Sequence, residues 1–230
     1  MKWSIVFGVF AGAGAWRDRE VAGGIGMILS GWISLAGLGV GLAYWLNAPR
    51  LLLKRADGRL GVWSWLLFWP YHLLSHLSLA LHRASATEAP FHEIIPGLFL
   101  GCRLRPKEAL QLDPRGVAAV LDLTSEFAEC ATLRRSGRYR CRPLLDHTAP
   151  SRQQLQDAVG FITEHLVHPP VYVHCAVGHG RSATVVAAFL LGQGSAASPQ
   201  DAVARLKAIR PGVRLNAAQM NRLRDFQDAL

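Results

Sequence analysis

An uncharged stretch from Val21 to Ala48 constrains this chain more than any other feature of its sequence. A helix of about 20 apolar residues is long enough to cross the hydrocarbon core of a bilayer, and this stretch exceeds that length. Residues 1–82 as a whole are rich in Gly, Ala, Leu, Val and Trp, whereas later residues mix polar and apolar types as soluble domains do. The sequence therefore predicts a membrane region over residues 1–82, with a spanning helix at about 21–48, and a globular domain over residues 92–230.

Residues 3–16 form a second apolar segment, which is short for a full crossing. Half of a spanning hairpin, a re-entrant piece and a signal-like segment are all compatible with its length. We expect it to stay in the membrane, because Lys2 is the only positive charge that leads it and another apolar segment follows at once.

Residues 60–81 form a third segment, in which aromatic and polar side chains separate from leucines. On a helix, one side collects Trp65, Trp69, His72, His76 and Arg83, and the other collects Leu66, Leu73, Leu74, Leu77 and Leu81. This separation is typical of a helix that lies in the membrane interface. A second spanning helix with aromatic ends fits the same residues equally well.

The formal net charge of +9 raises the question of a nucleic-acid partner. Such a partner requires a basic stripe together with a known binding motif, and the sequence contains no such motif. Anionic lipid headgroups explain the charge more simply, because each well-placed Lys or Arg adds about 1 kcal/mol of attraction toward them. We therefore expect membrane lipids as partners and no nucleic acid.

The globular domain alternates strands with helices. The segments Glu93–Leu100, Val117–Leu123 and Val171–His174 have the composition of strands, and the second is almost continuously apolar, as a buried parallel strand should be. Helix starts are indicated by a capping box at Ser151 and Gln154, and then at Arg181, Ser198 and Asn216. This order predicts an α/β fold with a central, mostly parallel sheet flanked by helices.

The stretch from Val171 to Ser182 indicates the chemistry, because a strand runs there into a glycine-containing loop and then into a helix. The amides of such a loop and the N-terminal end of the helix form a cradle for an anion, of which phosphate is the natural example. Cys175 stands at the start of the cradle, where its pKa can fall from about 8.5 to roughly 3.5–7.5, so we expect a nucleophilic thiolate. Arg181 can bind two phosphate oxygens at once.

The other residues of this stretch have expected supporting roles. Ser182 would place a hydroxyl beside the sulfur and stabilise it as a leaving group, and His174 would organise the loop through hydrogen bonds. The expected phosphate-binding set is Ala176, Val177, Gly178, His179, Gly180 and Arg181.

The residues His174, Cys175, Gly178, Arg181 and Ser182 match the signature His-Cys-Xaa-Xaa-Gly-Xaa-Xaa-Arg-Ser/Thr. Through them the sequence resembles the protein tyrosine phosphatase superfamily, and within it the dual-specificity phosphatases. The similarity extends over roughly residues 92–228 and includes the segments 94–101 and 210–216. The resemblance implies the dual-specificity phosphatase fold and a phosphoric monoester hydrolase that works without a metal or another cofactor.

The resemblance also implies a general acid, an Asp on a loop ahead of the signature. Asp146 is the best match, because it lies just before the capped helix. Asp122 is the competitor, although a role in supporting the turn after its strand suits it better. His147 and His179 are expected at the rim of the site as hydrogen-bonding residues.

The remaining cysteines, Cys102, Cys130 and Cys141, lack the spacing of zinc sites and are too few for a disulfide scaffold, so we expect small buried side chains in a reducing compartment. The basic residues Arg50, Lys54, Arg55 and Arg59 should face the cytoplasm. The catalytic domain is then cytoplasmic if residues 60–81 lie flat and on the opposite side if they span. We favour the cytoplasm, where a catalytic thiolate stays reduced.

Attachment to a bilayer favours a phospholipid substrate, because it raises the effective concentration of substrates in the same bilayer. Residues 180–191 are also similar to the branch of the family that dephosphorylates phosphatidylglycerophosphate. That branch commonly carries an extra basic residue in the loop, where this chain has Ala176, Val177 and His179. Phosphoproteins at the membrane are the alternative substrate. A phosphate-binding module without catalysis is the least favoured alternative, because nucleophile, arginine and acid are all present.

Overall fold

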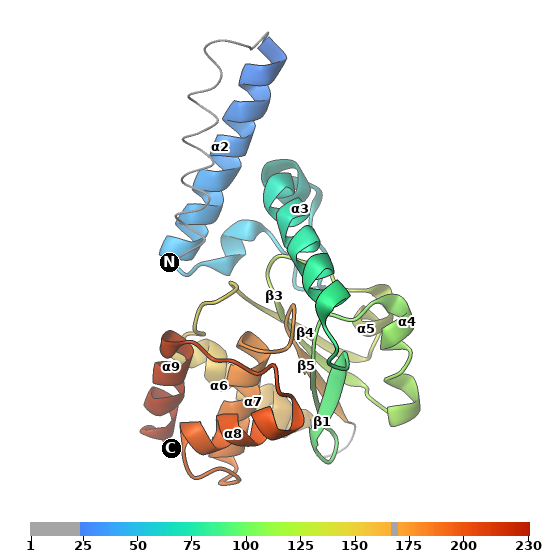
Figure 1. The fold of residues 1–230 in the computed structure, drawn as a ribbon, viewed down its shortest axis with the longest axis vertical. Helices are drawn as coiled ribbons and strands as arrows, with labels where there is room; N and C mark the ends of the chain where they lie inside the picture. Colours follow the sequence, from blue (N-terminus) through green and yellow to red (C-terminus); the bar gives the residue numbers. More distant parts are fainter. Residues whose placement is uncertain (1–23, 167–169) are drawn as a thin grey trace.

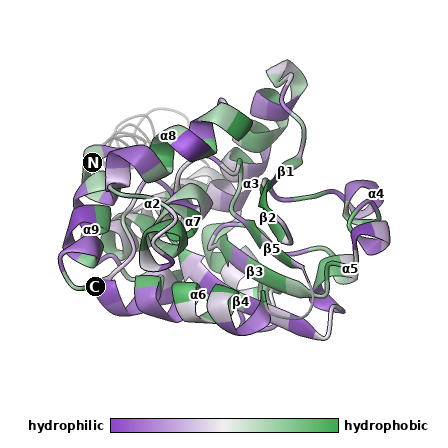
Figure 2. Cartoon of the chain, turned by 90° about the horizontal axis from the view of Figure 1, so that it is seen from below, coloured by the Kyte–Doolittle hydropathy of each residue, from purple (hydrophilic) through white to green (hydrophobic). Residues whose placement is uncertain are grey.

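A five-stranded sheet forms the centre of the protein in the computed structural model, which describes residues 24–166 and 170–230. The strands are β1 (Phe91–Ile95), β2 (Leu98–Gly101), β3 (Ala119–Thr124), β4 (Arg138–Leu144) and β5 (Val171–His174). Figure 1 shows the sheet within the whole chain, and Figure 2 shows the order of the strands across it, β1-β2-β5-β3-β4. Every neighbouring pair is parallel except β1 with β2. The predicted α/β fold with a mostly parallel sheet is confirmed. The segment 3–16 lies outside the described residues.

The prediction of one strand over residues 93–100 is wrong, because the chain reverses there. Gly97 adopts a φ of +80°, and the flanking strands β1 and β2 pair as an antiparallel hairpin. Strand β4 was not predicted at all. Its sequence places arginines at alternate positions and it lies at the edge of the sheet, so it lacks the apolar run that marks the buried strands.

Helices cover both faces of the sheet. The helices α6 (Arg152–His165), α7 (Arg181–Gly192), α8 (Pro199–Ile209) and α9 (Ala217–Gln227) lie on one side, and the short α4 (Pro106–Ala109) and α5 (Ala131–Arg134) lie on the other (Figures 1 and 2). The predicted caps are confirmed, since Ser151, Ser198 and Asn216 each accept a hydrogen bond from the third residue of their helix.

Alternation along the strands divides the core between the two faces. Leu121 and Val173 pack under α6–α9, whereas Val120 and Tyr172 pack against α4 and α5. The expected burial of the three other cysteines is confirmed, because Cys102, Cys130 and Cys141 are all buried and unpaired. Two short 3-10 helices, η1 (Pro49–Leu52) and η2 (Asp113–Arg115), complete the connections.

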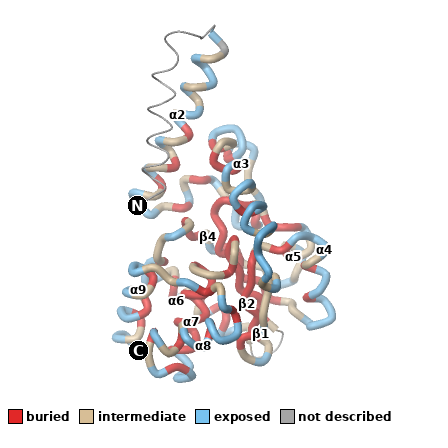
Figure 3. Tube along the Cα trace, viewed as in Figure 1, coloured by how far each residue is buried: buried red, intermediate tan, exposed pale blue. Residues whose placement is uncertain are grey.

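Helix α2 (Gly24–Trp45) projects from the catalytic body, which is the sheet together with the helices that flank it (Figure 1). Among the described helices it alone is long and apolar enough to cross a membrane, over Gly26–Trp45. Much of its length is exposed in Figure 3, including Leu35 and Leu38. Its C-terminal half packs on the body through Ala36, Val40 and Ala43.

Helix α3 (Val62–Ser85) runs from the level of α2 down along the body (Figure 1). It is kinked at Phe68, because Pro70, two residues later, has no N–H to donate to the hydrogen bonds of the helix. His72 is fully buried against the body, whereas Leu73, Leu77 and Leu81 are exposed on the other side. The predicted separation of the two sides is therefore present, and the leucine side is the one turned outward.

Candidate active site

The loop between β5 and α7, residues 175–180, directs its backbone carbonyls outward. The carbonyls of Ala176, Val177, Gly178 and His179 accept hydrogen bonds from the N–H of Arg103, from Nη2 and Nε of Arg210 and from the N–H of Arg214, at 2.9–3.1 Å. In a trans peptide the N–H points opposite to the C=O. The amides of residues 177–180 are thus turned to the inner side of the loop, where the N–H of Gly178 donates to Cys175 Sγ at 3.3 Å.

Gly178 can be nothing other than glycine in this loop. Its φ is +83°, and a Cβ there would lie 2.5 Å from the backbone of Gly101. The close approach of β2 to the loop depends on this residue.

Cys175 lies at the bottom of the cradle and is 3% exposed. Burial raises the pKa of its thiol, but the Arg181 guanidinium, the Ser182 hydroxyl and the amides of Ser182 and Gly178 outweigh burial and hold the pKa below its ordinary value. The Ser182 hydroxyl donates to the sulfur at 3.2 Å. The arrangement therefore favours the thiolate.

Arg181 is held in place by a residue that the sequence did not reveal. Glu126 accepts from both terminal nitrogens of the guanidinium, at 2.9 and 2.6 Å, and the Leu144 carbonyl accepts a third hydrogen bond at 2.9 Å. Burial raises the pKa of Glu126, but the charge of Arg181 more than offsets it and keeps that pKa below its usual range. Glu126 follows the C-terminal end of a central parallel strand, which is where sites in such sheets gather.

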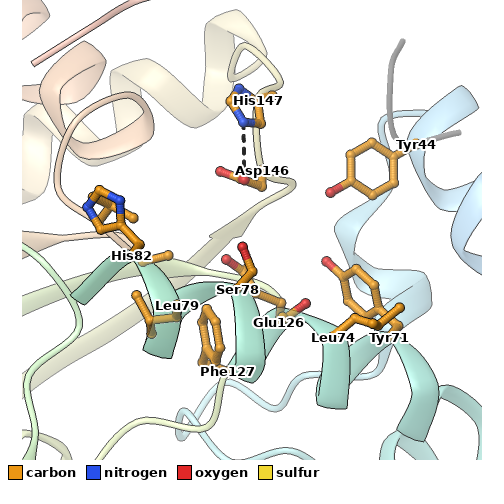
Figure 4. Close-up of a pocket in the computed structure, with 13 residues that line it drawn as sticks. Tyr44, Tyr71, Leu74, Ser78, Leu79, His82, Glu126, Phe127, Asp146 and His147 are labelled. Atoms are coloured by element: carbon orange, nitrogen blue, oxygen red, sulfur yellow. Dashed lines mark ion pairs between the residues drawn. The ribbon is translucent and has the colours of Figure 1, made fainter. Parts of the chain in front are cut away.

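Asp146 stands over the cradle on the loop before α6. Its Oδ1 lies 3.0 Å from Arg181 Nη2, and its side chain is 44% exposed. The next residue, His147, adopts a left-handed φ of +58°, and its carbonyl accepts a hydrogen bond from Asn216 at 2.8 Å. Figure 4 shows Asp146 and His147 facing α3 across a pocket.

Most of the expected site residues line two adjoining pockets. One contains Cys175, His179, Gly180, Arg181 and Asp146, and the other contains Ala176, Val177 and Asp146. Ser182 lies beneath the sulfur. His179 is directed away from the sulfur, with Nε2 2.6 Å from Glu88 Oε2, which agrees with the expected place at the rim.

His174 lies behind the loop within a buried charge network. Its Nε2 lies 3.1 Å from Glu129 Oε2, which is close enough for an ion pair. The angle between the two groups is too poor for a hydrogen bond. Burial lowers the pKa of His174, but Glu129 and Asp122 raise it by more. Asp122, Glu129 and His174 could together hold a metal by geometry. A cation is already supplied there by Lys54, whose Nζ lies 2.6 Å from Asp122 Oδ2.

Lys54 and Asp122 each bear on a prediction made above. The expected basic cluster keeps Arg50, Arg55 and Arg59 exposed, whereas the Lys54 side chain is fully buried and takes no part in the exposed basic surface. Asp122 is also fully buried and accepts a hydrogen bond from the Tyr139 hydroxyl at 2.7 Å. The structure thus places Asp146 at the pocket and Asp122 behind it.

The protein also resembles known sequences. The sequence model of the family described as "Dual specificity phosphatase, catalytic domain" matches residues 98–229. Phosphatidylglycerophosphate phosphatase PTPMT1 of Arabidopsis thaliana is 33% identical over 132 residues, covering 53% of this chain and 38% of that protein. Dual specificity protein phosphatase 6 of Homo sapiens is 30% identical over 140 residues, covering 60% and 36%. This chain therefore spans less than two fifths of the length of these two relatives.

A third relative matches over most of its own length. Phosphatidylglycerophosphatase and protein-tyrosine phosphatase 1 of Homo sapiens is 30% identical over 146 residues, covering 59% of this chain and 72% of that protein. Among solved structures, the crystal structure of PTPMT1 in complex with PI(5)P superposes with a TM-score of 0.56 at 22% identity, covering 61% of this chain and 96% of that one. This likeness supports the fold.

Proposed function

This chain belongs to the dual-specificity phosphatase family, a class of phosphoric monoester hydrolases, and from that premise we propose that it acts through a phospho-cysteine formed on Cys175. The observation that carries the proposal is the surroundings of the sulfur. Hydroxyl and amide donors lie 3.2 and 3.3 Å from Sγ, and Arg181 and Asp146 face the same pocket.

In the first step, the Cys175 thiolate attacks phosphorus and the bond from phosphorus to the substrate oxygen breaks. Protonated Asp146 gives its proton to that oxygen. Arg181, whose Nη2 lies 3.0 Å from Asp146 Oδ1, binds the transferring phosphoryl group in the same pocket. The inward amides and the guanidinium then stabilise the developing charge.

In the second step, water attacks the phosphorus of the phospho-cysteine and the bond from phosphorus to sulfur breaks. The Asp146 carboxylate accepts the proton of the water. The Ser182 hydroxyl, which donates to Sγ at 3.2 Å, stabilises the thiolate as it leaves. Inorganic phosphate is the product, and the cysteine returns to its starting charge.

Trapping of the intermediate tests this mechanism. Acid quenching during turnover of a radiolabelled aryl phosphate should leave label on the peptide that contains Cys175, and the Cys175→Ser variant should carry none on that peptide. Asp146→Ala should slow alkyl phosphates far more than aryl phosphates, because aryl oxides leave without a proton. Turnover with no label on Cys175 would reject the proposal.

We further propose that the substrate is a phospholipid. Helix α2 is apolar enough to span a membrane, and the next helix, α3, lines the pocket that contains Asp146. Two relatives are named as phosphatidylglycerophosphate phosphatases. Assays in detergent on phosphatidylglycerophosphate, phosphoinositides and phosphopeptides would identify the preferred class, with Cys175→Ser as control.

Phosphoproteins remain the second candidate, because one relative is a dual specificity protein phosphatase and another is named as a protein-tyrosine phosphatase as well. Higher kcat/KM on phosphopeptides than on every lipid tested would favour it. For the orientation we propose a cytoplasmic catalytic domain, supported by the exposed Arg50, Arg55 and Arg59 beside the C-terminal end of α2.

A further inference from the structure

An apolar groove lies between α2 and α3, on the side of α2 that faces the catalytic body. Its walls are formed by Ile33, Ala36, Gly37 and Val40 of α2 and by Pro70, Tyr71 and Leu74 of α3. None of these side chains carries a charge. Because they belong to the segment that is long and apolar enough to span a bilayer and to its neighbour, lipid tails would meet the groove directly once α2 is inserted.

The groove leads toward the catalytic loop. Tyr71 and Leu74 line both the groove and the pocket that contains Glu126 and Asp146. Asp146 in turn also lines the pocket that contains Cys175. Figure 4 shows the middle of this path, with Tyr71 and Leu74 on one side of the pocket, His82 on the other and Asp146 across from the stretch of α3 between them.

The chemistry of the lining changes along the path in the same order as the parts of a phospholipid. The α2 end is apolar. Hydroxyls follow in the middle, from Tyr44, Tyr71, Ser75 and Ser78, where an ester and a glycerol backbone need polar partners. The far end holds the cationic cradle for a phosphate, beside Cys175 and Arg181.

We propose that the groove between α2 and α3 binds a fatty-acyl chain of the lipid whose phosphate monoester lies at Cys175. This inference rests on the phospholipid substrate proposed above and makes it more specific. The substrate then enters sideways from the bilayer, and the length of its chain contributes to kcat/KM. A soluble aryl phosphate reaches the same cysteine without touching the groove.

Filling the groove tests the inference. Gly37→Phe adds a side chain to its wall, and Gly31→Phe is the matched control, because Gly31 is exposed on the same helix with nothing within 4 Å of an added Cβ. In mixed micelles, Gly37→Phe should lower kcat/KM for dioleoyl phosphatidylglycerophosphate by about tenfold, the effect of about two methylene groups left unburied. It should leave the dibutanoyl analogue and p-nitrophenyl phosphate within about twofold of wild type, as should the control on all three substrates.

A second pair of variants guards against a folding defect in α2. Leu74→Gln alters the groove, whereas Leu77→Gln alters an exposed leucine of the same helix that lines neither the groove nor the pocket. Equal losses of kcat/KM on the long-chain lipid within each pair of variants would overturn the acyl-chain site. So would a wild-type kcat/KM that does not depend on the length of the acyl chain. Hydrolysis of p-nitrophenyl phosphate without any lipid turnover would also overturn it while leaving the phosphatase mechanism intact.

Photolabelling gives a readout that does not need activity. Dioleoyl phosphatidylglycerophosphate with a diazirine on one acyl chain should label peptides 33–40 and 70–74 in the Cys175→Ser variant, and vanadate should compete. Label confined to the outer face of α2, at Leu35 and Leu38, would contradict the inference. Failure of the phosphatase proposal itself would appear separately, as a wild-type enzyme inactive on every phosphate ester.

Discussion

Cys175 depends on donors that are neighbours in space and also near in sequence, since Gly178, Arg181 and Ser182 all belong to the same loop and helix. This is why its thiolate could be predicted from a motif alone. Arg181, by contrast, owes its position to Glu126, a residue far from it in sequence. An isolated glutamate in a loop cannot be distinguished from a solvated charge until the fold brings its partner to it.

We expect Cys175 to be alkylated by iodoacetamide with a midpoint below about pH 8.5, the value of a free cysteine. The pKa is held low partly by the Ser182 hydroxyl, so Ser182→Ala should move the midpoint upward. Peptide mass spectrometry across pH would measure both. Cys130, whose pKa burial raises to about 11, is the internal control and should stay unmodified in the folded protein. A midpoint at or above that of free cysteine would contradict a stabilised thiolate.

Glu126→Gln should lower kcat/KM on an aryl phosphate by about tenfold or more, because a misplaced guanidinium no longer matches the transferring phosphoryl group. The carboxylate makes two hydrogen bonds to Arg181, and an amide can accept only one of them. Steady-state kinetics with vanadate inhibition would measure the loss. Glu164→Gln, on the exposed side of α6, should have no effect, and equal behaviour of the two variants would remove Glu126 from the site.

At the scale of elements, the segment between α2 and α3 belongs to the catalytic body through a buried ion pair. Lys54 Nζ donates to Asp122 Oδ2, and to the carbonyl and hydroxyl of Thr124 at 2.8 and 2.7 Å. Burial raises the pKa of Asp122, but Lys54 outweighs it and holds that pKa well below its usual range. Removal of one partner would leave the other charge buried and alone.

We expect Lys54→Met to destabilise the protein by about 3–5 kcal/mol, the cost of breaking a buried pair. Because the folded-state pKa of Asp122 is depressed, the pair contributes above about pH 4 and its contribution is lost as pH falls through that pKa. Denaturant titration in detergent at pH 7 would measure the cost. The double variant Lys54→Met/Asp122→Asn should recover part of it, and a single variant as stable as wild type would show that the pair is dispensable.

The sequence predicted those elements whose signals are local. Ser151, Ser198 and Asn216 mark helix starts through hydrogen bonds within one turn, and β3 and β5 are mostly apolar runs. The hairpin of β1 and β2 was missed, because its reversal depends on the backbone of Gly97. The role of Arg210, which binds two carbonyls of the catalytic loop, depends on a contact across the fold that no local pattern reveals.

At the scale of the molecule, the sequence predicts a membrane region over 1–82 and a catalytic domain over 92–230. In the structure, several contacts join residues of the first region to residues of the second. Lys54 pairs with Asp122, His72 hydrogen-bonds to the carbonyl of Glu126, and Leu79 packs on Phe127. We propose that the part of the chain needed for folding and for hydrolysis of soluble phosphates begins near residue 49.

Two shortened chains test where that part begins. A chain of residues 49–230 keeps Lys54 and α3, and we expect it to fold and to hydrolyse p-nitrophenyl phosphate. A chain of residues 86–230 loses both, and we expect a lower denaturation midpoint and at least tenfold lower kcat/KM, since Asp122 is left unpaired and Glu126 loses a neighbour. Equal stability and turnover of the two chains would instead favour the boundary near residue 82.

The end of α2 is joined to the loop that carries Asp146: the Asn47 amide donates to the Ala149 carbonyl at 3.2 Å, and Leu145 packs against Ala43. With α2 inserted in a bilayer, this joint fixes the height of the catalytic mouth above the lipid surface. Esters borne on long flexible tails in the aqueous phase would have to bend down to it, whereas phosphates at headgroup depth already lie within reach. The distance of a phosphate from the membrane surface would then decide whether it is a substrate, as much as its shape does.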